Sequence, residues 1–265
     1  MSAHLVSVGK VFHKKFARKG INLRLKNEFM KKCFCMQSGM RRSIALLLAA
    51  SAIFPLSAQT SVSVPEKIEW TWEVRPPNPD LRLPNVLLLG DSITRNYFPQ
   101  VTKDLAGVAN VYLMASSTSI GDPRLPHQIA EFAAMEKVQF RVVHFNNGMH
   151  GWGYSESQYK SAFPQFLCAI RKLVGRKGAL IWASTTPVRQ DVADGATNTR
   201  VEKRNAIALS LVKGAGIPLD DQHALMVQHH DFYEDDVHFN SEGANIQGDQ
   251  AASTIRTALR TVTSQ

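Results

Sequence analysis

The chain has 265 residues, enough for one large domain or two small ones. Its formal charge of +9 arises in the first 58 residues, which hold eleven Lys and Arg but one acid, whereas residues 59–265 hold 20 basic and 21 acidic residues. The basic balance therefore belongs to the N-terminal segment, and the rest of the chain gives no reason to expect nucleic acid or an anionic membrane as a partner.

Residues 1–58 are interpreted as a leader. Two arginines, Arg41 and Arg42, precede an apolar stretch at 44–56, and small residues follow it up to Ala58. This order is typical of a secretory signal peptide that is cleaved after Ala58. The apolar stretch is shorter than the length that a helix needs to cross a bilayer, so no stable membrane association is expected after cleavage. A single uncleaved membrane anchor is the alternative interpretation.

The first 39 residues are basic and fit no fold, which suggests that translation starts at Met40 or Met30. A signal peptide predicts export to a periplasm or to the extracellular space. The sequence specifies no oligomeric state.

Residues 59–84 form an entry segment ahead of the main domain. Residues 70–72 alternate Trp-Thr-Trp as a short strand would, and the prolines between 76 and 79 then exclude regular structure. The two tryptophans either cover an edge of the main domain or stack on a sugar ring in a substrate site.

From residue 85 to residue 265, short apolar runs alternate with helical patterns, which predicts a single domain. Each run is continuous rather than alternating, as expected of buried parallel strands. The predicted strands are Val86–Leu89, Ala109–Met114, Val142–Phe145, Ala179–Ala183 and Ile217–Leu219. The predicted helices are Ile93–Leu105, Pro126–Met135, Ser155–Leu173, Asn198–Ala215 and Glu242–Leu259. This alternation predicts a three-layer α/β/α fold with a five-stranded parallel sheet.

The first apolar run breaks at Gly90-Asp91-Ser92, directly before a helical segment. Ser92 is therefore expected at the carboxyl end of the sheet beside a helix N-terminus, where open α/β sheets bind ligands and where backbone N–H groups favour negative charge. A serine at this place is a candidate nucleophile, provided that a base activates it. The alternative is that Ser92 only caps its helix.

A base is available near the other end of the chain, in Asp235-Asp236-Val237-His238. His238 can accept the proton of Ser92, and Asp235 can orient the imidazole. The surrounding stretch, residues 229–238, also contains many nitrogen and oxygen groups, but its spacing matches no defined zinc signature. Because of this spacing, no metal is expected. Phosphate-binding glycine motifs are absent, so no nucleotide cofactor is expected either.

With Gly-Asp-Ser after the first strand and Asp-x-x-His before the last helix, the chain resembles the GDSL/SGNH hydrolase superfamily over most of residues 85–258. Members of that family are esterases, lipases, thioesterases and carbohydrate deacetylases, and they need no metal. The resemblance implies a flavodoxin-like sheet, with Ser92 as nucleophile, His238 as base and Asp235 as orienting acid. Asp236 is then only a neighbour of the site.

The family also implies an oxyanion hole made of the serine N–H, a glycine N–H and an asparagine side chain. Gly121 is the only glycine in residues 115–122, the block that follows the second predicted strand, and takes the glycine role. After the third strand, the expected G-x-N-D block is replaced by Asn-Asn-Gly-Met-His at 146–150, which resembles a less-studied branch of the superfamily. Either Asn147 or His150 can be the side-chain donor, because a neutral imidazole also donates one N–H.

The expected reaction is hydrolysis of small acyl esters, first of all acetyl esters on carbohydrate, through an acyl-enzyme. Its substrate is then a small-molecule or polysaccharide ester. Trp152, Tyr154 and Arg189 follow predicted strands and are expected to border the substrate. A generic short-chain esterase or thioesterase is the second hypothesis, and a non-catalytic glycan-binding module the third. Since a binding module needs no complete Ser-His-Asp set, these three residues favour the enzyme.

Overall fold

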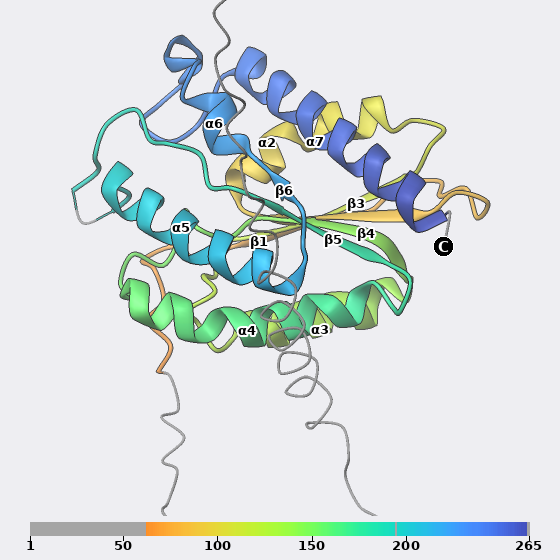
Figure 1. Ribbon diagram of the computed structural model, residues 1–265, viewed down its shortest axis with the longest axis horizontal. Helices are drawn as coiled ribbons and strands as arrows, with labels where there is room; N and C mark the ends of the chain where they lie inside the picture. Colours follow the sequence, from red (N-terminus) through yellow and green to blue (C-terminus); the bar gives the residue numbers. More distant parts are fainter. Residues whose placement is uncertain (1–61, 194, 264–265) are drawn as a thin grey trace, which may run out of the picture. The chain divides into compact units, whose positions relative to one another are not determined.

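The computed structural model describes residues 62–193 and 195–263; the predicted leader, residues 1–58, lies outside this part of the chain. Among the helices described, none combines the length and the apolar character needed to cross a bilayer. The elements described form an α/β fold with helices on both faces of one sheet (Figure 1).

The sheet has six strands in the order β1-β3-β2-β4-β5-β6. Strands β2 to β6 pair with one another in parallel and correspond to the five predicted strands. Their bounds, with the added β1, are β1 Thr71–Val74, β2 Asn85–Gly90, β3 Asn110–Ser116, β4 Phe140–Phe145, β5 Ala179–Ala183 and β6 Leu219–Asp220. The three-layer fold and its flavodoxin-like parallel strand order are thus confirmed.

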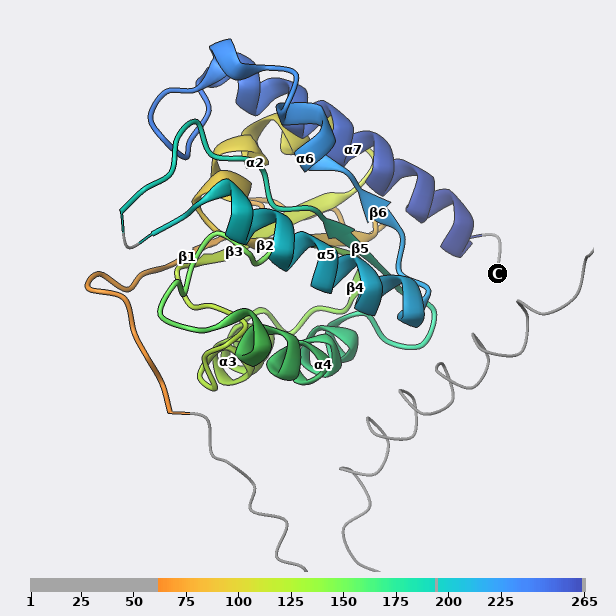
Figure 2. The same cartoon turned by 60° about the vertical axis from the view of Figure 1, so that its left-hand side comes forward.

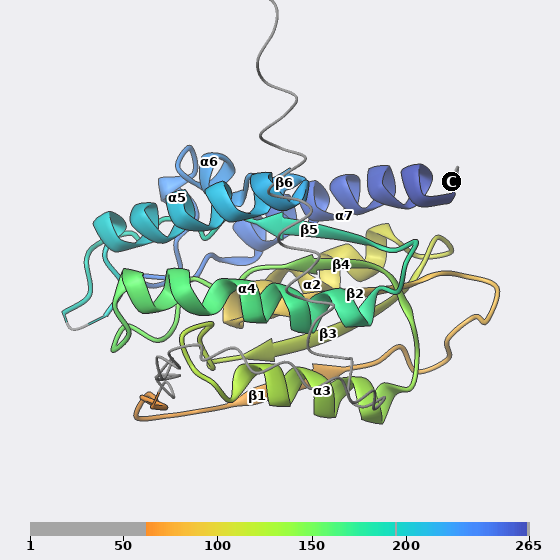
Figure 3. The same cartoon turned by 60° about the horizontal axis from the view of Figure 1, so that its bottom comes forward.

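Strand β1 is the addition that the sequence analysis did not place in the sheet. It pairs antiparallel with β3, with Thr71 opposite Ser116 and Val74 opposite Leu113. Figure 3 shows β1 and β6 at opposite edges of the sheet. The segment that we treated as an entry to the main domain is therefore part of its sheet.

Two helical layers cover the sheet. Helices α2 and α7 pack together on one face, and α3, α4 and α5 cover the other (Figures 1 and 2). The helices are α2 Ser92–Asp104, α3 Leu125–Glu136, α4 Glu156–Leu173, α5 Asn198–Ala215, α6 Gln222–Met226 and α7 Ser241–Thr263, with a 3-10 turn η1 at His230–Phe232. The short elements α6 and η1 were not predicted, because five- and three-residue helices carry no periodic signal.

Local sequence explains where the elements begin and end. The apolar residues of β2 are buried on both faces of the sheet, as a central parallel strand requires. Ser155 and Gln158 form a capping box at the start of α4. Gly216 ends α5 with a φ of 69°, a left-handed conformation that glycine adopts without steric cost.

The strand order also determines where a ligand can bind. The chain leaves β2 toward one helical layer through α2 and leaves β4 toward the other layer through α4, although β2 and β4 are neighbours. Such a switch point opens a crevice at the carboxyl ends of the two strands. Ser92, at the start of α2, and His150, in the loop after β4, both face this crevice.

Candidate active site

Ser92 is the first residue of α2, directly after the end of β2. Asp91, not Ser92, caps the helix: its Oδ1 accepts from the backbone N–H of Ile93 at 3.0 Å and of Thr94 at 3.5 Å. The hydroxyl of Ser92 is therefore available for another partner, and the capping alternative is excluded. Gly90 is required before it, because a Cβ there would lie 2.0 Å from Oγ1 of Thr94.

Three side chains form a hydrogen-bonded chain that ends at this serine. Oγ of Ser92 lies 2.7 Å from Nε2 of His238, and Nδ1 of His238 lies 2.8 Å from Oδ2 of Asp235. A carboxylate accepts hydrogen bonds only, so Nδ1 carries a hydrogen and Nε2 of the neutral ring is free to accept from Ser92. This is the arrangement in which a histidine removes a proton from a serine.

The loop between η1 and α7 fixes the positions of the histidine and its carboxylate. Oδ1 of Asp235 accepts from the backbone N–H of Val237 at 2.7 Å and of His238 at 2.6 Å. Burial alone would raise the pKa of Asp235, but these two backbone bonds and the His238 side chain outweigh it and lower the pKa to about 2. The carboxylate is therefore ionised under all ordinary conditions.

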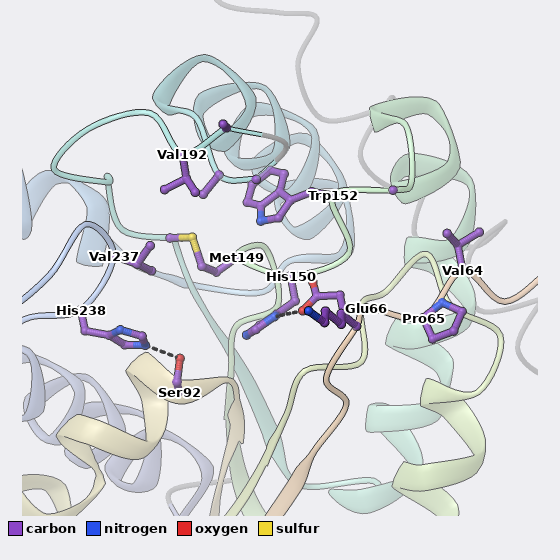
Figure 4. Close-up of a pocket in the computed structure, with 15 residues that line it drawn as sticks. Val64, Pro65, Glu66, Ser92, Met149, His150, Trp152, Val192, Val237 and His238 are labelled. Carbon is purple, nitrogen blue, oxygen red and sulfur yellow. Dashed lines mark hydrogen bonds and ion pairs between the residues drawn. The ribbon is translucent and has the colours of Figure 1, made fainter.

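An open pocket of about 550 Å³ lies over Ser92 and His238. Figure 4 shows the two residues at one side of this pocket, with His150 and Glu66 beside them. The lining is largely apolar and comes from five parts of the chain: Val64, Pro65, Glu66, Lys67, Ser92, Met149, His150, Trp152, Gly153, Val192, Ala193, Gly195, Ala196, Val237 and His238. Ser92 thus faces a cavity large enough for a small ligand.

Glu66 is a pocket residue that the sequence analysis missed. Its Oε2 lies 2.9 Å from Nδ1 of His150, and its Oε1 accepts from the backbone N–H of Gly151 at 2.7 Å. The segment that carries it is held over the site by a bond from Ser63 Oγ to Asp122 at 2.7 Å and one from Val64 N to Tyr154 Oη at 2.5 Å. No local motif marks Glu66, because the residue that it binds lies 84 positions along the chain.

The two candidates for the side-chain donor of the oxyanion hole, Asn147 and His150, lie in different places relative to the pocket. His150 lines the pocket, and its Nε2 is buried without a partner among the described residues. Asn147 does not line it: its Oδ1 accepts from Ile120 N at 2.8 Å and its Nδ2 donates to Thr118 O at 2.9 Å. The amide of Asn147 therefore holds the loop after β3.

The glycine expected in the oxyanion hole is also placed elsewhere. The N–H of Gly121 donates to Oγ of Ser119 at 3.2 Å, and the residue is buried against the ring of Tyr154. Gly121 does not line the pocket. The assignment depended on Gly121 being the only glycine in the block after the second predicted strand. In the structure, the lack of a side chain at Gly121 leaves room for the Tyr154 ring.

Of the three expected substrate contacts, only Trp152 borders the pocket. Tyr154 is buried, and its hydroxyl donates to Asp122 at 3.0 Å. Arg189 forms an ion pair with Asp236 at 3.1 Å outside this pocket. The loop after β5 nevertheless reaches the pocket through Val192 and Ala196.

Arg204 of α5 is a second residue that the sequence analysis missed. Its side chain is 0% exposed, and its Nη1 donates to the carbonyls of Gly148 at 3.0 Å and His150 at 2.7 Å. Its Nη2 donates to the carbonyl of Gly151 at 2.8 Å. Burial lowers the pKa of this guanidinium to about 10, so it stays charged at neutral pH. One buried cation therefore holds the loop that presents His150.

The histidine and acid cluster at 229–238 has an ordinary structural explanation. His229 stacks on Phe232 with ring centroids 4.8 Å apart, and His230 packs edge-on against Tyr233. Among the described residues, no group of three histidine, cysteine or acidic side chains is arranged to hold a metal ion.

Comparisons with known proteins define the fold. No protein-family model and no curated protein matches the sequence. Solved structures do match. A protein described as an SGNH hydrolase, from Slackia heliotrinireducens, is 19% identical over 65% of this chain and 99% of its own, with a TM-score of 0.52. A member of the lipolytic G-D-S-L family from Veillonella parvula is 17% identical over 65% of this chain and 98% of its own, with a TM-score of 0.52.

A third match is a carbohydrate esterase of family 3 from Talaromyces cellulolyticus. It is 16% identical over 67% of this chain and 99% of its own, with a TM-score of 0.53. This chain therefore contains nearly the whole length of each of these neighbours, and its fold is that of the SGNH/GDSL hydrolases.

Proposed function

We propose that this protein is a serine esterase that removes small acyl groups, first of all acetyl, from carbohydrate esters. The observation that carries the proposal is the chain of two hydrogen bonds from Asp235 through His238 to Ser92, which ends in an open pocket. The similarity in fold to a carbohydrate esterase supports the choice of substrate class.

In the proposed reaction, Oγ of Ser92 attacks the ester carbonyl carbon while Nε2 of His238 takes the hydroxyl proton. The tetrahedral intermediate collapses as the bond to the leaving oxygen breaks, and His238 returns the proton to the departing alcohol. Water then attacks the acyl-enzyme with His238 again as base, which releases the carboxylic acid and restores Ser92.

The negative oxygen of the intermediate forms beside the N-terminus of α2. The backbone N–H of Ser92 and Nε2 of His150 are the proposed donors. A single donor of this kind accounts for about 3–4 kcal/mol of transition-state stabilisation.

The pocket lining supports a small acyl group. The apolar side chains that line the pocket include Met149, Val192 and Val237. Trp152 offers an aromatic surface on which a sugar ring can pack. The same apolar lining also admits generic short-chain esters or thioesters, which is the second candidate function.

The test is hydrolysis of p-nitrophenyl acetate by the wild-type protein, by Ser92→Ala and by Ser155→Ala. Ser155 caps α4 away from the pocket and is a matched control. We expect turnover that Ser92→Ala abolishes and Ser155→Ala retains, with rates that fall from acetate to octanoate. Equal background rates in all three proteins, without labelling of Ser92 by a fluorophosphonate, would favour a glycan-binding module instead.

We also propose that the protein acts outside the cytoplasm, on the basis of the signal-peptide pattern at residues 40–58. Cell fractionation followed by N-terminal sequencing tests this proposal. Mature protein that begins near Gln59 in the exported fraction is the expected result, and full-length protein in the cytoplasm would contradict it.

A further inference from the structure

A second histidine–carboxylate pair faces the pocket of Ser92. Both oxygens of Glu66 accept hydrogen bonds, Oε2 from Nδ1 of His150 and Oε1 from the backbone of Gly151. Because a carboxylate cannot donate, Nδ1 of His150 must carry a hydrogen. The ring edge opposite Glu66 therefore determines what His150 can do.

That opposite edge is Nε2, which is buried and has no partner among the described residues. Figure 4 shows the ring between Glu66 and Ser92, with Nε2 on the side of Ser92. A neutral imidazole with its hydrogen on Nδ1 presents a lone pair at Nε2, which repels an oxyanion. Only the imidazolium has N–H groups on both nitrogens.

The charges around His150 favour the imidazolium. Burial alone would lower the pKa of His150, but the hydrogen bond to Glu66 and the negative charges of Asp91, Glu66 and Glu69 outweigh it and raise the pKa. Cations oppose this charge: the Arg204 guanidinium binds the His150 carbonyl, Lys67 lines the same pocket, and Arg124 pairs with Glu69 at 3.3 Å. On the remaining side, the Trp70 ring packs edge-on against the imidazole with centroids 5.7 Å apart.

We infer that Glu66, from the segment before β1, keeps His150 as an imidazolium whose Nε2–H donates to the oxyanion formed at Ser92. This inference rests on the proposed function. In this chain, a cationic His150 then takes the place of the neutral asparagine amide that the resemblance to the SGNH family implies. Glu66 is a positioning residue, because it acts through His150 and does not contact the reacting atoms.

The inference predicts an alkaline limit on activity. Because the pKa of His150 is raised, the proton on its Nε2 is lost at a higher pH than that of an ordinary histidine. The profile of kcat/KM should therefore have an alkaline limb, which reports the loss of the proton from His150.

The first experiment measures the charge state directly, by a nitrogen-15 NMR titration of the histidine side chains in the purified protein. His150→Asn assigns the signals. We expect both ring nitrogens of His150 to carry hydrogens across neutral pH in the wild type. In Glu66→Gln the titration midpoint should move down by about one pH unit or more, since a charged partner is lost. Glu73→Gln, the same change in β1, should leave the midpoint unchanged.

The second experiment compares kcat/KM profiles for the same proteins. Glu66→Gln should move the alkaline limb down by the same amount as the NMR midpoint, and His150→Asn should abolish that limb while some activity remains. A neutral His150 with a bare Nε2 across the active pH range would overturn the inference. That outcome leaves the proposed function intact if Ser92→Ala is still inactive, so the two proposals fail separately.

Discussion

Nε2 of His238 lies 2.7 Å from Oγ of Ser92, although 146 positions of the chain separate the two residues. Backbone hydrogen bonds set this distance from both ends. Asp91 caps α2 and so orients Ser92, and the Asp235 carboxylate binds the backbone N–H of His238 as well as its ring. The reacting groups are thus positioned by the start of one helix and by one short loop.

Asp235→Asn should lower kcat by about 10³- to 10⁴-fold with little change in KM. An asparagine retains an oxygen for the backbone N–H groups of Val237 and His238, so the loop should fold. Its Nδ2, however, donates toward Nδ1 of His238 and forces the hydrogen onto Nε2. The base then has no lone pair for Ser92. Steady-state kinetics on p-nitrophenyl acetate measure the effect.

The matched control is Asp236→Asn, because this neighbouring carboxylate binds Arg189 and Gln190 on the exposed side of the loop. Its kcat should stay within about twofold of the wild type, as expected for an exposed ion pair. Equal losses in the two variants would indicate general loop damage and would contradict the assigned role of Asp235.

Arg204→Met should lower the free energy of unfolding by about 3 kcal/mol or more, because it leaves the buried carbonyls of Gly148, His150 and Gly151 without a donor. It should also reduce kcat, since the loop that presents His150 is no longer held. Urea unfolding and kinetics at saturating substrate measure the two effects.

Arg189→Met is the comparison for this variant. Arg189 is 41% exposed and pairs with an exposed carboxylate, so its loss should cost no more than about 1 kcal/mol. It should not change KM, because Arg189 lies outside the pocket. A large rise in KM would instead restore the original prediction that Arg189 binds substrate.

The sequence predicted those parts of the site that depend on local signals. Ser92 follows a strand that ends in glycine, and His238 follows Asp235 by three residues in one loop, so each motif could be found without knowing the fold. The parallel order of β2 and β4 then brings the loops after them to the same crevice. Arg204 was also detectable, because it lies on the buried stripe of α5 with Val201 and Ala208.

The sequence did not predict the contacts that depend on long-range pairing. Glu66 reaches His150 because β1 joins the sheet antiparallel to β3, and four residues of strand carry too little signal to predict that pairing. Gly121 was assigned because it is the only glycine in its block, and Asn147 by counting from a strand end. In the structure, both form hydrogen bonds within loops outside the pocket lining, since a position in the sequence does not specify which way an N–H or a side chain points.

Trp152→Ala should raise KM for an acetylated oligosaccharide by about tenfold, because the ring offers the main aromatic surface of the pocket. It should change KM for p-nitrophenyl acetate much less, since the small acyl group contacts the serine side of the cavity. Trp152→Phe should retain most of the affinity. Equal increases in KM for both substrates would argue against sugar stacking at this ring.

Asp122 links the stability of the protein to pH and to the placement of Glu66. Burial alone would raise the pKa of Asp122, but hydrogen bonds from Arg124, Ser63 and Tyr154 outweigh it and lower the pKa to about 2, from an ordinary value of 3.8. A lowered pKa contributes stability that is complete above the ordinary value and is lost as the pH falls toward 2. The contribution is about 2 kcal/mol.

Asp122→Asn should therefore be less stable than the wild type at pH 6, and the difference should shrink by about 2 kcal/mol as the pH falls from 5 to 2. Urea unfolding across this range measures it. Because Asp122 anchors Ser63, the variant also loosens the segment that carries Glu66, and its kcat should fall together with its stability at neutral pH. A constant stability difference at every pH would show that the ionised carboxylate contributes nothing.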